Sequence, residues 1–199
     1  MSASRGMILA AVRANAPGAA VPLPAIPLFD DDQSPALERF RASFELLGGT
    51  FVDCPPGADP KRVIAELFPD ARVICSNAPE VPGNRRLEDV RAPAELEDVD
   101  VAVVRPAFAV AETGSIYLSE VEFGINALGY LAQHLVALLD PADILGNLHH
   151  AYRHPAFAAA RYAVLMSGPS ATADIEGVLI RGAQGVRSLK VLPIPRPPA

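Results

Sequence analysis

The sequence predicts an open α/β fold in three layers, built around a mostly parallel sheet. Apolar runs typical of strands alternate with segments of helical spacing, and this order of elements places helices against a sheet. The run from Val101 to Val104 has no polar alternation, as a strand buried on both faces requires. At 199 residues, half of them apolar, the chain is expected to form one domain with a full core.

The N-terminal segment is expected to lie outside that domain. Residues 4–15 have helical spacing of apolar side chains and predict a short helix. Residues 16–35 contain five prolines, whose fixed φ and missing N–H groups exclude regular elements, so an extended strap or a flexible arm is predicted. The expected division is a helix and proline-rich arm over 1–34, an α/β domain over 35–195 and a tail over 196–199.

The first half of the domain is expected to contain a docking helix and a βαβ unit. Ser34-Pro35 predicts a helix start, because a capping residue precedes a proline at the first helical position, and Gly48-Gly49 predicts its end. One face of this helix is apolar and consists of Leu37, Phe40, Phe44 and Leu47. The βαβ unit follows as a strand over 50–54, a helix over 59–68 and a strand over 72–75.

The second half is expected to add strands on both sides of two polar turns. The runs 108–111 and 115–118 flank the turn at Glu112-Thr113-Gly114 and predict a hairpin or a broken strand, with Gly114 supplying a positive φ. The remaining predicted elements are a buried strand at 134–139, a helix from Pro141 to about Tyr152, a strand at 162–166 whose following turn opens a helix, and a last strand at 189–192.

Composition excludes several classes of protein. The formal charge of −6 and the lack of a basic stripe argue against nucleic-acid binding. The longest apolar stretch, Val101 to Leu118, contains Arg105, Pro106 and Glu112, so no membrane span is predicted. The N-terminal apolar run is only six residues long and is followed by Arg13, which is unlike a secretory signal. Two cysteines are few for this length, and a reduced, cytoplasmic location is expected.

Common cofactor and nucleophile motifs are absent. There is neither G-x-G-x-x-G after a strand nor a P-loop, and Gly168-Pro169-Ser170 lacks the second glycine of a nucleophile elbow. Cys54 and Cys75 are 21 positions apart, so the chain alone is not expected to hold an iron–sulfur cluster, and the cofactor stays unknown. The pair His150 and His154 has metal-ligand spacing, but a solvated helix end explains the histidines better, and no metal site is predicted.

The two polar turns are the candidate site. We hypothesise that the turn at 112–115 and the turn at 167–176 meet over one pocket, with Glu112 and Asp174 as catalytic acids. These acids would offset the positive end of a helix dipole, so a neutral polyol, a hydroxy acid or a ribose-bearing ligand fits better than a bare phosphate. The candidate ligand-binding residues are Thr113, Gly114, Ser115, Gly168, Pro169, Ser170, Thr172 and Glu176.

The segments Ala111-Glu112-Thr113-Gly114-Ser115 and Ser167 to Glu176 resemble the two signature motifs of the LUD-domain family, which includes the LutC or YkgG lactate-utilisation proteins. The resemblance covers roughly residues 35 to 195. It implies a fold similar to the NagB/RpiA/CoA-transferase superfamily. It also implies a role in a bacterial lactate-oxidising complex whose other subunits carry the iron–sulfur centres.

The chain departs from that family at two positions of interest. Gln184 stands where the closing motif usually has a histidine, so proton transfer by that side chain is lost. Ala171 stands where many relatives have arginine, which removes a cation that could pair with a ligand carboxylate. The leading interpretation is an accessory or ligand-binding component of lactate or related organic-acid oxidation. The alternatives are a stand-alone enzyme similar to sugar-phosphate isomerases or CoA transferases that uses Glu112, and a structural subunit without ligand.

Overall fold

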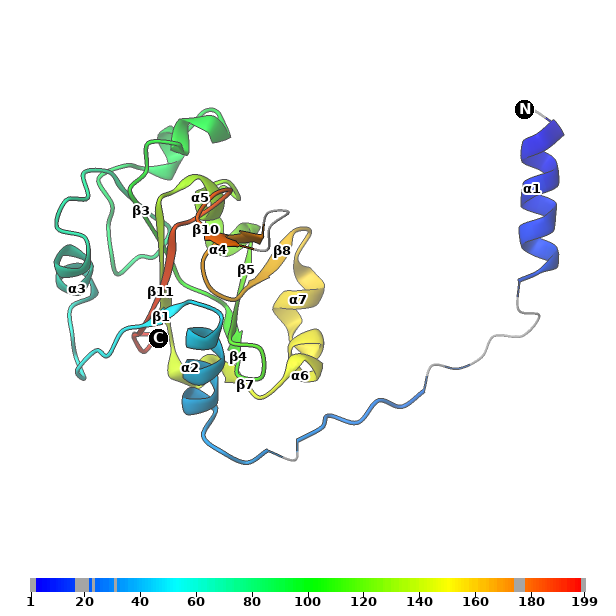
Figure 1. The fold of residues 1–199 in the computed structure, drawn as a ribbon, viewed down its shortest axis with the longest axis horizontal. Coiled ribbons are helices and arrows are strands. Elements are labelled where there is room, and N and C mark those ends of the chain that lie inside the picture. The colour runs from blue at the N-terminus through cyan, green and yellow to red at the C-terminus, as the bar shows by residue number, and fades with distance from the viewer. Residues whose placement is uncertain (1–2, 17–21, 23, 31, 174–177, 198–199) are drawn as a thin grey trace.

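The computed structural model describes residues 3–16, 22, 24–30, 32–173 and 178–197, and its centre is a five-stranded parallel sheet (Figure 1). The strand order is β1-β11-β6-β3-β2, and every neighbouring pair is parallel. The predicted mixed α/β fold with a mostly parallel central sheet is therefore confirmed. The strands of this sheet are β1 (Thr50–Phe51), β2 (Ile74–Ser76), β3 (Val101–Val104), β6 (His134–Leu139) and β11 (Ser188–Pro193).

A second sheet of four strands lies beside the first, in the order β7-β4-β5-β8. Its strands β4 and β5 form an antiparallel hairpin around the turn at residues 111–114, which confirms the hairpin alternative. The third layer of the fold is therefore this sheet with its helices, rather than helices alone. Its strands are β4 (Phe108–Val110), β5 (Ser115–Ser119), β7 (Ile144–Leu145) and β8 (Ala163–Met166).

The strand β3 shows how the layers are held together. Val101 and Val103 pack on the side of helix α3 (Pro60–Leu67), in a cluster that includes the buried Ile64. Ala102 and Val104 point the other way and pack in the cluster that joins the two sheets. All four residues are fully buried, because each face of this strand is covered by a separate layer.

The remaining helices cover the edges and outer faces. The predicted N-terminal helix is α1 (Ala3–Ala14), which stands apart from the domain in Figure 1. The docking helix is α2 (Ala36–Leu46); Phe40 and Phe44 are buried, whereas Leu47 is half exposed. Within the described residues, no helix has the length and apolar content needed to cross a bilayer. The shorter helices are α4 (Glu120–Phe123), α5 (Leu128–Leu131), α6 (Leu148–Arg153) and α7 (Pro155–Ala159), and the 3₁₀ turns are η1 (Leu87–Asp89), η2 (Pro93–Leu96) and η3 (Pro141–Asp143).

The predicted helix from Pro141 to Tyr152 is wrong. After the 3₁₀ turn η3, the chain forms strand β7, which pairs with β4 at the edge of the second sheet. Helix α6 begins only after Asn147, whose side-chain oxygen accepts from the backbone N–H groups of His149 and His150. The backbone of Ile144 and Leu145 finds its hydrogen-bond partners on β4. Local helical spacing could not reveal these partners.

The prediction that the second polar turn opens a helix is also wrong. Strand β9 (Ala171–Ala173) follows that turn and pairs antiparallel with strand β10 (Leu179–Arg181). The side chains of Ser170 and Thr172 therefore do not cap a helix N-terminus. Asp174 and Glu176 lie outside the described residues.

The C-terminal end of α2 lies directly over both polar turns. Gly114, at φ +58°, is placed so that a Cβ would overlap the backbone of Ser43 and Phe44. Gly168, at φ +92°, is placed so that a Cβ would overlap the carbonyl of Leu47. Both positions combine a left-handed backbone with a close approach of another backbone, so glycine is required at each for two independent reasons.

We predict that Gly114→Ala destabilises the protein by about 3 kcal/mol or more, because left-handed strain is added to an overlap with α2. The matched control is Gly57→Ala, since Gly57 also has a positive φ of +77° but has open space around its Cβ position. The control is expected to cost about 1 kcal/mol. Urea unfolding of both variants measures the difference, and equal costs would show that α2 does not constrain the turn.

Candidate functional site

The first polar turn places Glu112 at the start of helix α6. Glu112 is exposed, and its Oε2 accepts a hydrogen bond of 3.0 Å from the backbone N–H of Leu148. Its own backbone N–H donates to the carbonyl of Gly146 at 3.2 Å. The carboxylate is therefore held at the N-terminal end of a short helix, where the unpaired backbone N–H groups favour a negative charge.

A chain of three hydroxyls connects the first polar turn to the second. Ser115 Oγ lies 2.7 Å from Thr113 Oγ1 and 2.6 Å from Ser167 Oγ. Ser115 is only 3% exposed, so its hydroxyl needs these partners. The structure therefore brings Thr113, Ser115 and Ser167 together, and Ser167 also lines the smaller cavity described below.

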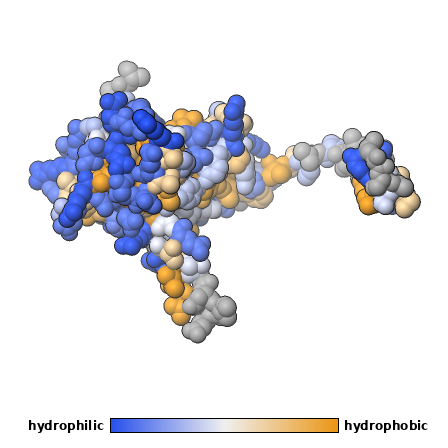
Figure 2. All heavy atoms as spheres, turned by 90° about the horizontal axis from the view of Figure 1, so that it is seen from above, coloured by the Kyte–Doolittle hydropathy of each residue, from blue (hydrophilic) through white to orange (hydrophobic). Residues whose placement is uncertain are grey.

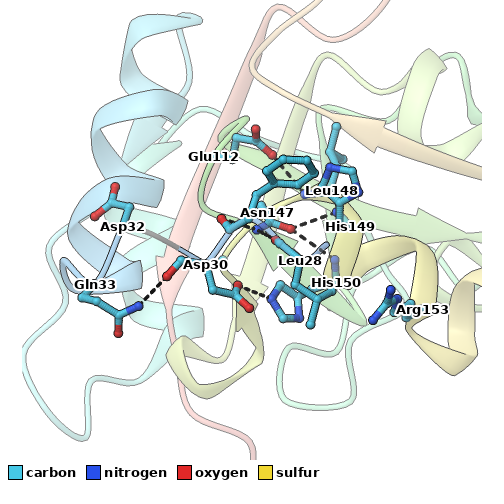
Figure 3. Close-up of polar contacts among 12 residues, drawn as sticks. Leu28, Asp30, Asp32, Gln33, Glu112, Asn147, Leu148, His149, His150 and Arg153 are labelled. Atoms are coloured by element: carbon cyan, nitrogen blue, oxygen red, sulfur yellow. Dashed lines mark hydrogen bonds and ion pairs between the residues drawn. The ribbon is translucent and has the colours of Figure 1, made fainter. Parts of the chain in front are cut away.

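Glu112 lines a cavity of about 730 Å³ that is bounded by α2, the loop at Gly146 and part of the N-terminal arm. We call this the Glu112 cavity, and we call the arm residues over it the strap (residues 26–30, 32 and 33). Figure 3 shows Leu28 and Asp30 of the strap beside Asn147 and His150 at the start of α6. The residues that line the cavity are Phe29, Asp30, Asp32, Gln33, Arg39, Ala42, Ser43, Ala111, Glu112, Gly146, Asn147 and His150.

The strap is held by side chains of α6 and its cap (Figure 3). Asn147 Nδ2 donates to the carbonyl oxygens of Leu28 at 2.6 Å and of Phe29 at 3.3 Å. His150 Nε2 lies 2.6 Å from Asp30 Oδ1. Because Asn147 is 8% exposed and also caps α6, one buried amide joins the arm to the domain. The described arm residues 26–30 thus lie along the domain, next to Asn147 and His150.

A second set of contacts fixes the strap to α2. Arg39 donates to the carbonyl oxygens of Asp32 and Gly146 and pairs with the Asp32 carboxylate at 3.0 Å. Hydrogen bonds from the Ser34 hydroxyl and backbone N–H, with Arg39 as a further donor, lower the pKa of Asp32 to about 2. Asp32 is therefore ionised at neutral pH, and the guanidinium of Arg39 is already balanced by it.

The Glu112 cavity is consequently acidic. Asp30, Asp32 and Glu112 contribute three carboxylates, of which Asp32 pairs with Arg39 and Asp30 lies 2.6 Å from His150 Nε2. An anionic ligand would meet net repulsion there, whereas hydroxyl groups could donate to these oxygens. The cavity therefore favours a neutral hydroxylated molecule over a free carboxylate or a phosphate.

The second polar turn lines a different, smaller cavity of about 330 Å³. None of the described residues that line it is charged, and the turn contributes Ser167, Gly168, Pro169, Ser170 and Ala171. The backbone N–H of Ser170 donates to the carbonyl oxygen of Val186, and the carbonyl oxygen of Ser170 accepts from the backbone N–H of Gly182. Gln184 also lines this cavity and is exposed, as is Ala171. Tyr130 also lines this smaller cavity. Burial raises the pKa of its hydroxyl, and the hydrogen bond to Tyr162 raises it further.

The structure thus separates residues that the sequence hypothesis placed in one pocket. Glu112 borders one cavity, and the described part of the second turn borders another. Gly114 and Gly168 pack under α2, and Thr172 lies opposite Ile180 in the hairpin of β9 and β10. The position of Asp174 relative to Glu112 falls outside the described residues.

The three histidines near helix α6 each contact a neighbouring group. His150 pairs with Asp30, and the ring of His149 lies 4.8 Å from that of Phe29. His154 lies outside helix α6. Its Nδ1 accepts a hydrogen bond from the backbone N–H of Ala156 and so caps α7. In the part of the chain that the structure describes, no three His, Cys, Asp or Glu side chains are grouped as metal ligands.

Sequence reasoning missed Asn147, Asp30, Arg39 and His150 as wall residues of the cavity. Asn147 had a detectable signal, since Asn before a run of helical spacing is a common N-cap. Asp30 and His150 had none, because they are 120 positions apart and only the folded chain brings them together.

Comparisons with known proteins agree with the fold. The sequence matches the family model described as "LUD domain" over residues 86–194, a range that includes both polar turns. Among solved structures, the crystal structure of a DUF162 family protein from Deinococcus radiodurans is similar, with a TM-score of 0.63 and 22% sequence identity. The similarity covers 83% of this chain and 98% of that chain, and at this identity it shows the fold alone. No curated protein matches the sequence.

We predict that Asn147→Ala lowers the stability by about 1 kcal/mol through loss of the α6 cap, and also releases the strap. Asp59→Ala is the matched control, because Asp59 caps α3 in the same way but does not contact the strap. Hydrogen exchange of residues 26–30 should accelerate in Asn147→Ala and stay unchanged in Asp59→Ala. Equal exchange in the two variants would show that Asn147 does not hold the strap.

Proposed function

Since the chain belongs to the LUD-domain family, we propose that it is an accessory, ligand-binding component of lactate or related organic-acid oxidation. The proposed ligand site is the Glu112 cavity. One observation carries this proposal. The carboxylate of Glu112, in the first family motif, accepts a hydrogen bond from the backbone N–H of Leu148 and lines a cavity that is covered by the strap.

The charges of the cavity support a particular ligand class. The cavity has three carboxylates, with Arg39 already paired to Asp32 and His150 to Asp30, and this favours a neutral molecule rich in hydroxyls, such as a polyol or a ribose-bearing compound. Ala171, where many relatives carry arginine, adds no cation to the second cavity. The organic acid itself would then be oxidised on another subunit, and this chain would bind a neutral molecule.

The cysteines support a division of labour with a redox partner. Cys75 is buried and Cys54 is half-buried, and desolvation raises the pKa of both thiols. Two neutral thiols do not provide the thiolate set that iron–sulfur clusters require. We therefore assign the electron carriers of the proposed complex to a partner subunit.

The stand-alone enzyme with Glu112 as base or nucleophile has less support. Glu112 is exposed and already accepts a hydrogen bond from Leu148, so its carboxylate is not sheltered from water.

Thermal unfolding with separate additions of D-ribose, glycerol and L-lactate tests the proposal. A neutral ligand at 100 times its dissociation constant should add about 2.7 kcal/mol of stability, and L-lactate should add little. Glu112→Gln should weaken binding of the neutral ligand roughly tenfold, since it keeps the acceptor for Leu148 but removes the charge. Glu97→Gln, at an exposed site outside the cavity, serves as control.

Two results would contradict the proposal. One is stabilisation by L-lactate but by neither neutral compound, because the charge argument would then be wrong. The other is binding that Glu112→Gln leaves unchanged, because the ligand would then lie elsewhere on the molecule.

A further inference from the structure

A cavity of about 390 Å³ lies at the carboxyl ends of the parallel strands. Its walls come from the segments that follow β2, β3 and β11, together with helix α4. Parallel α/β sheets usually bind their ligands at this edge, because the loops that leave the strands converge there. We call it the Arg105 cavity, after the arginine that directly follows β3.

The Arg105 cavity is separate from the site described above. It shares no lining residue with the Glu112 cavity. Neither the strap nor helix α1, which stands apart from the domain in Figure 1 and Figure 2, lines it. A ligand bound there is therefore independent of the one proposed for the Glu112 cavity.

The backbone of two strands holds Arg105 in place. Its side chain is only 7% exposed. Its Nη1 donates to the carbonyl oxygens of Leu138 at 3.1 Å and of Ile194 at 3.0 Å. Leu138 belongs to β6, and Ile194 directly follows β11. The ends of the neighbouring strands thus orient the guanidinium.

The remaining edge of this guanidinium lacks hydrogen bonds. Among the described residues, Nε and Nη2 of Arg105 are buried without an acceptor, and Oε2 of Glu80 is buried without a donor. Nη2 lies 2.6 Å from Glu80 Oε1, but this contact is an ion pair in which the N–H groups do not point at the oxygen. Glu80 therefore balances the charge of Arg105 and leaves its hydrogen-bonding capacity unused.

The unused edge is the one with which arginine recognises a carboxylate. Nε–H and Nη2–H are parallel and match the two oxygens of one carboxylate. Glu80 lies in a turn and its side chain is 18% exposed, whereas Arg105 is fixed by the strands. Exchange of Glu80 for an aligned carboxylate keeps the buried charge balanced and adds two hydrogen bonds.

The other walls of the cavity indicate what that carboxylate is attached to. Pro79, Val121 and Pro197 present exposed apolar surface. The other charged residues are Glu122 and Arg196, and Arg196 is already paired with an acid outside the cavity. A second anionic group on the ligand would be repelled by Glu122, and none of the described lining residues offers it an unpaired cation. The walls therefore fit a single carboxylate on a compact apolar body.

We propose that the Arg105 cavity binds a small monocarboxylate with an apolar body, which takes the place of Glu80 on Arg105. Glu80 is a built-in competitor of this ligand. It holds the guanidinium while the ligand is absent and turns toward solvent when the ligand binds. The apparent affinity is therefore set by the fraction of molecules in which Glu80 has left Arg105.

NMR titration of the isotope-labelled full chain with sodium benzoate tests the site. Benzoate should shift the backbone amide signals within residues 77–81 and those of Arg105 and Arg196. Benzamide has the same shape without the charge and should leave these signals unchanged, and sodium chloride at equal ionic strength controls for salt. Lack of these shifts with benzoate, or equal shifts with benzamide, would overturn the proposal.

Glu80→Gln tests the competition. Loss of the competing charge should lower the dissociation constant of benzoate about tenfold or more, because Arg105 is then available in most molecules. Glu88→Gln is the matched control, since Glu88 pairs with Arg86 at the surface and lies outside the cavity. If Glu80→Gln unfolds at a lower temperature, benzoate should restore the loss and benzamide should not. A dissociation constant equal to that of the wild type would contradict the exchange.

Arg105→Lys separates charge from geometry. Lysine keeps the positive charge but lacks the parallel N–H groups, so benzoate should bind at least about tenfold more weakly. Thermal unfolding without benzoate shows whether the variant is folded at the temperature of the titration. Binding of benzoate to folded Arg105→Lys with the affinity of the wild type would place the ligand elsewhere and overturn the proposal.

Discussion

The close approach of α2 to two glycines is the constraint on which the arrangement of the sheets depends. Gly114 ends the turn between β4 and β5, and Gly168 follows β8, so one helix end touches two neighbouring strands, β5 and β8, at the same end of the second sheet. Phe40 and Phe44 on the same helix fill the core between the two sheets. Backbone packing and side-chain packing are thus coupled, and a side chain at either glycine would push α2 away from the core.

The hydroxyl chain and the strap build on this arrangement. The antiparallel pairing of β5 with β8 brings Ser115 and Ser167 within 2.6 Å of each other. Arg39 on α2 reaches both the strap and the Gly146 loop. The two polar turns, which the sequence suggested as one ligand site, therefore also form the contact between α2 and the second sheet. Glu112 lines one cavity, and the second turn lines another whose described lining residues are uncharged.

The sequence predicted what depends on local pattern and missed what depends on distant partners. Uninterrupted apolar runs such as Val101 to Val104 identified buried parallel strands, and Gly114 identified the hairpin turn. The strand β7 was missed because its two residues pair with β4, more than thirty positions earlier. The hairpin of β9 and β10 was missed because Ser170 and Thr172 are common in caps as well as in strands. Asp30 and His150 had no local signal at all.

The order of strands in the parallel sheet also bears on how the chain is made. β11, the last strand, lies between β1 and β6, so Thr50 has its partner at Lys190. On the ribosome, β1 must wait beside an unfilled position until Ser188–Pro193 has emerged, and the loop that closes then is almost as long as the domain. The sheet is therefore completed from its C-terminal end, and a nascent chain stalled before Ser188 would expose the flank of β6 to any other strand nearby.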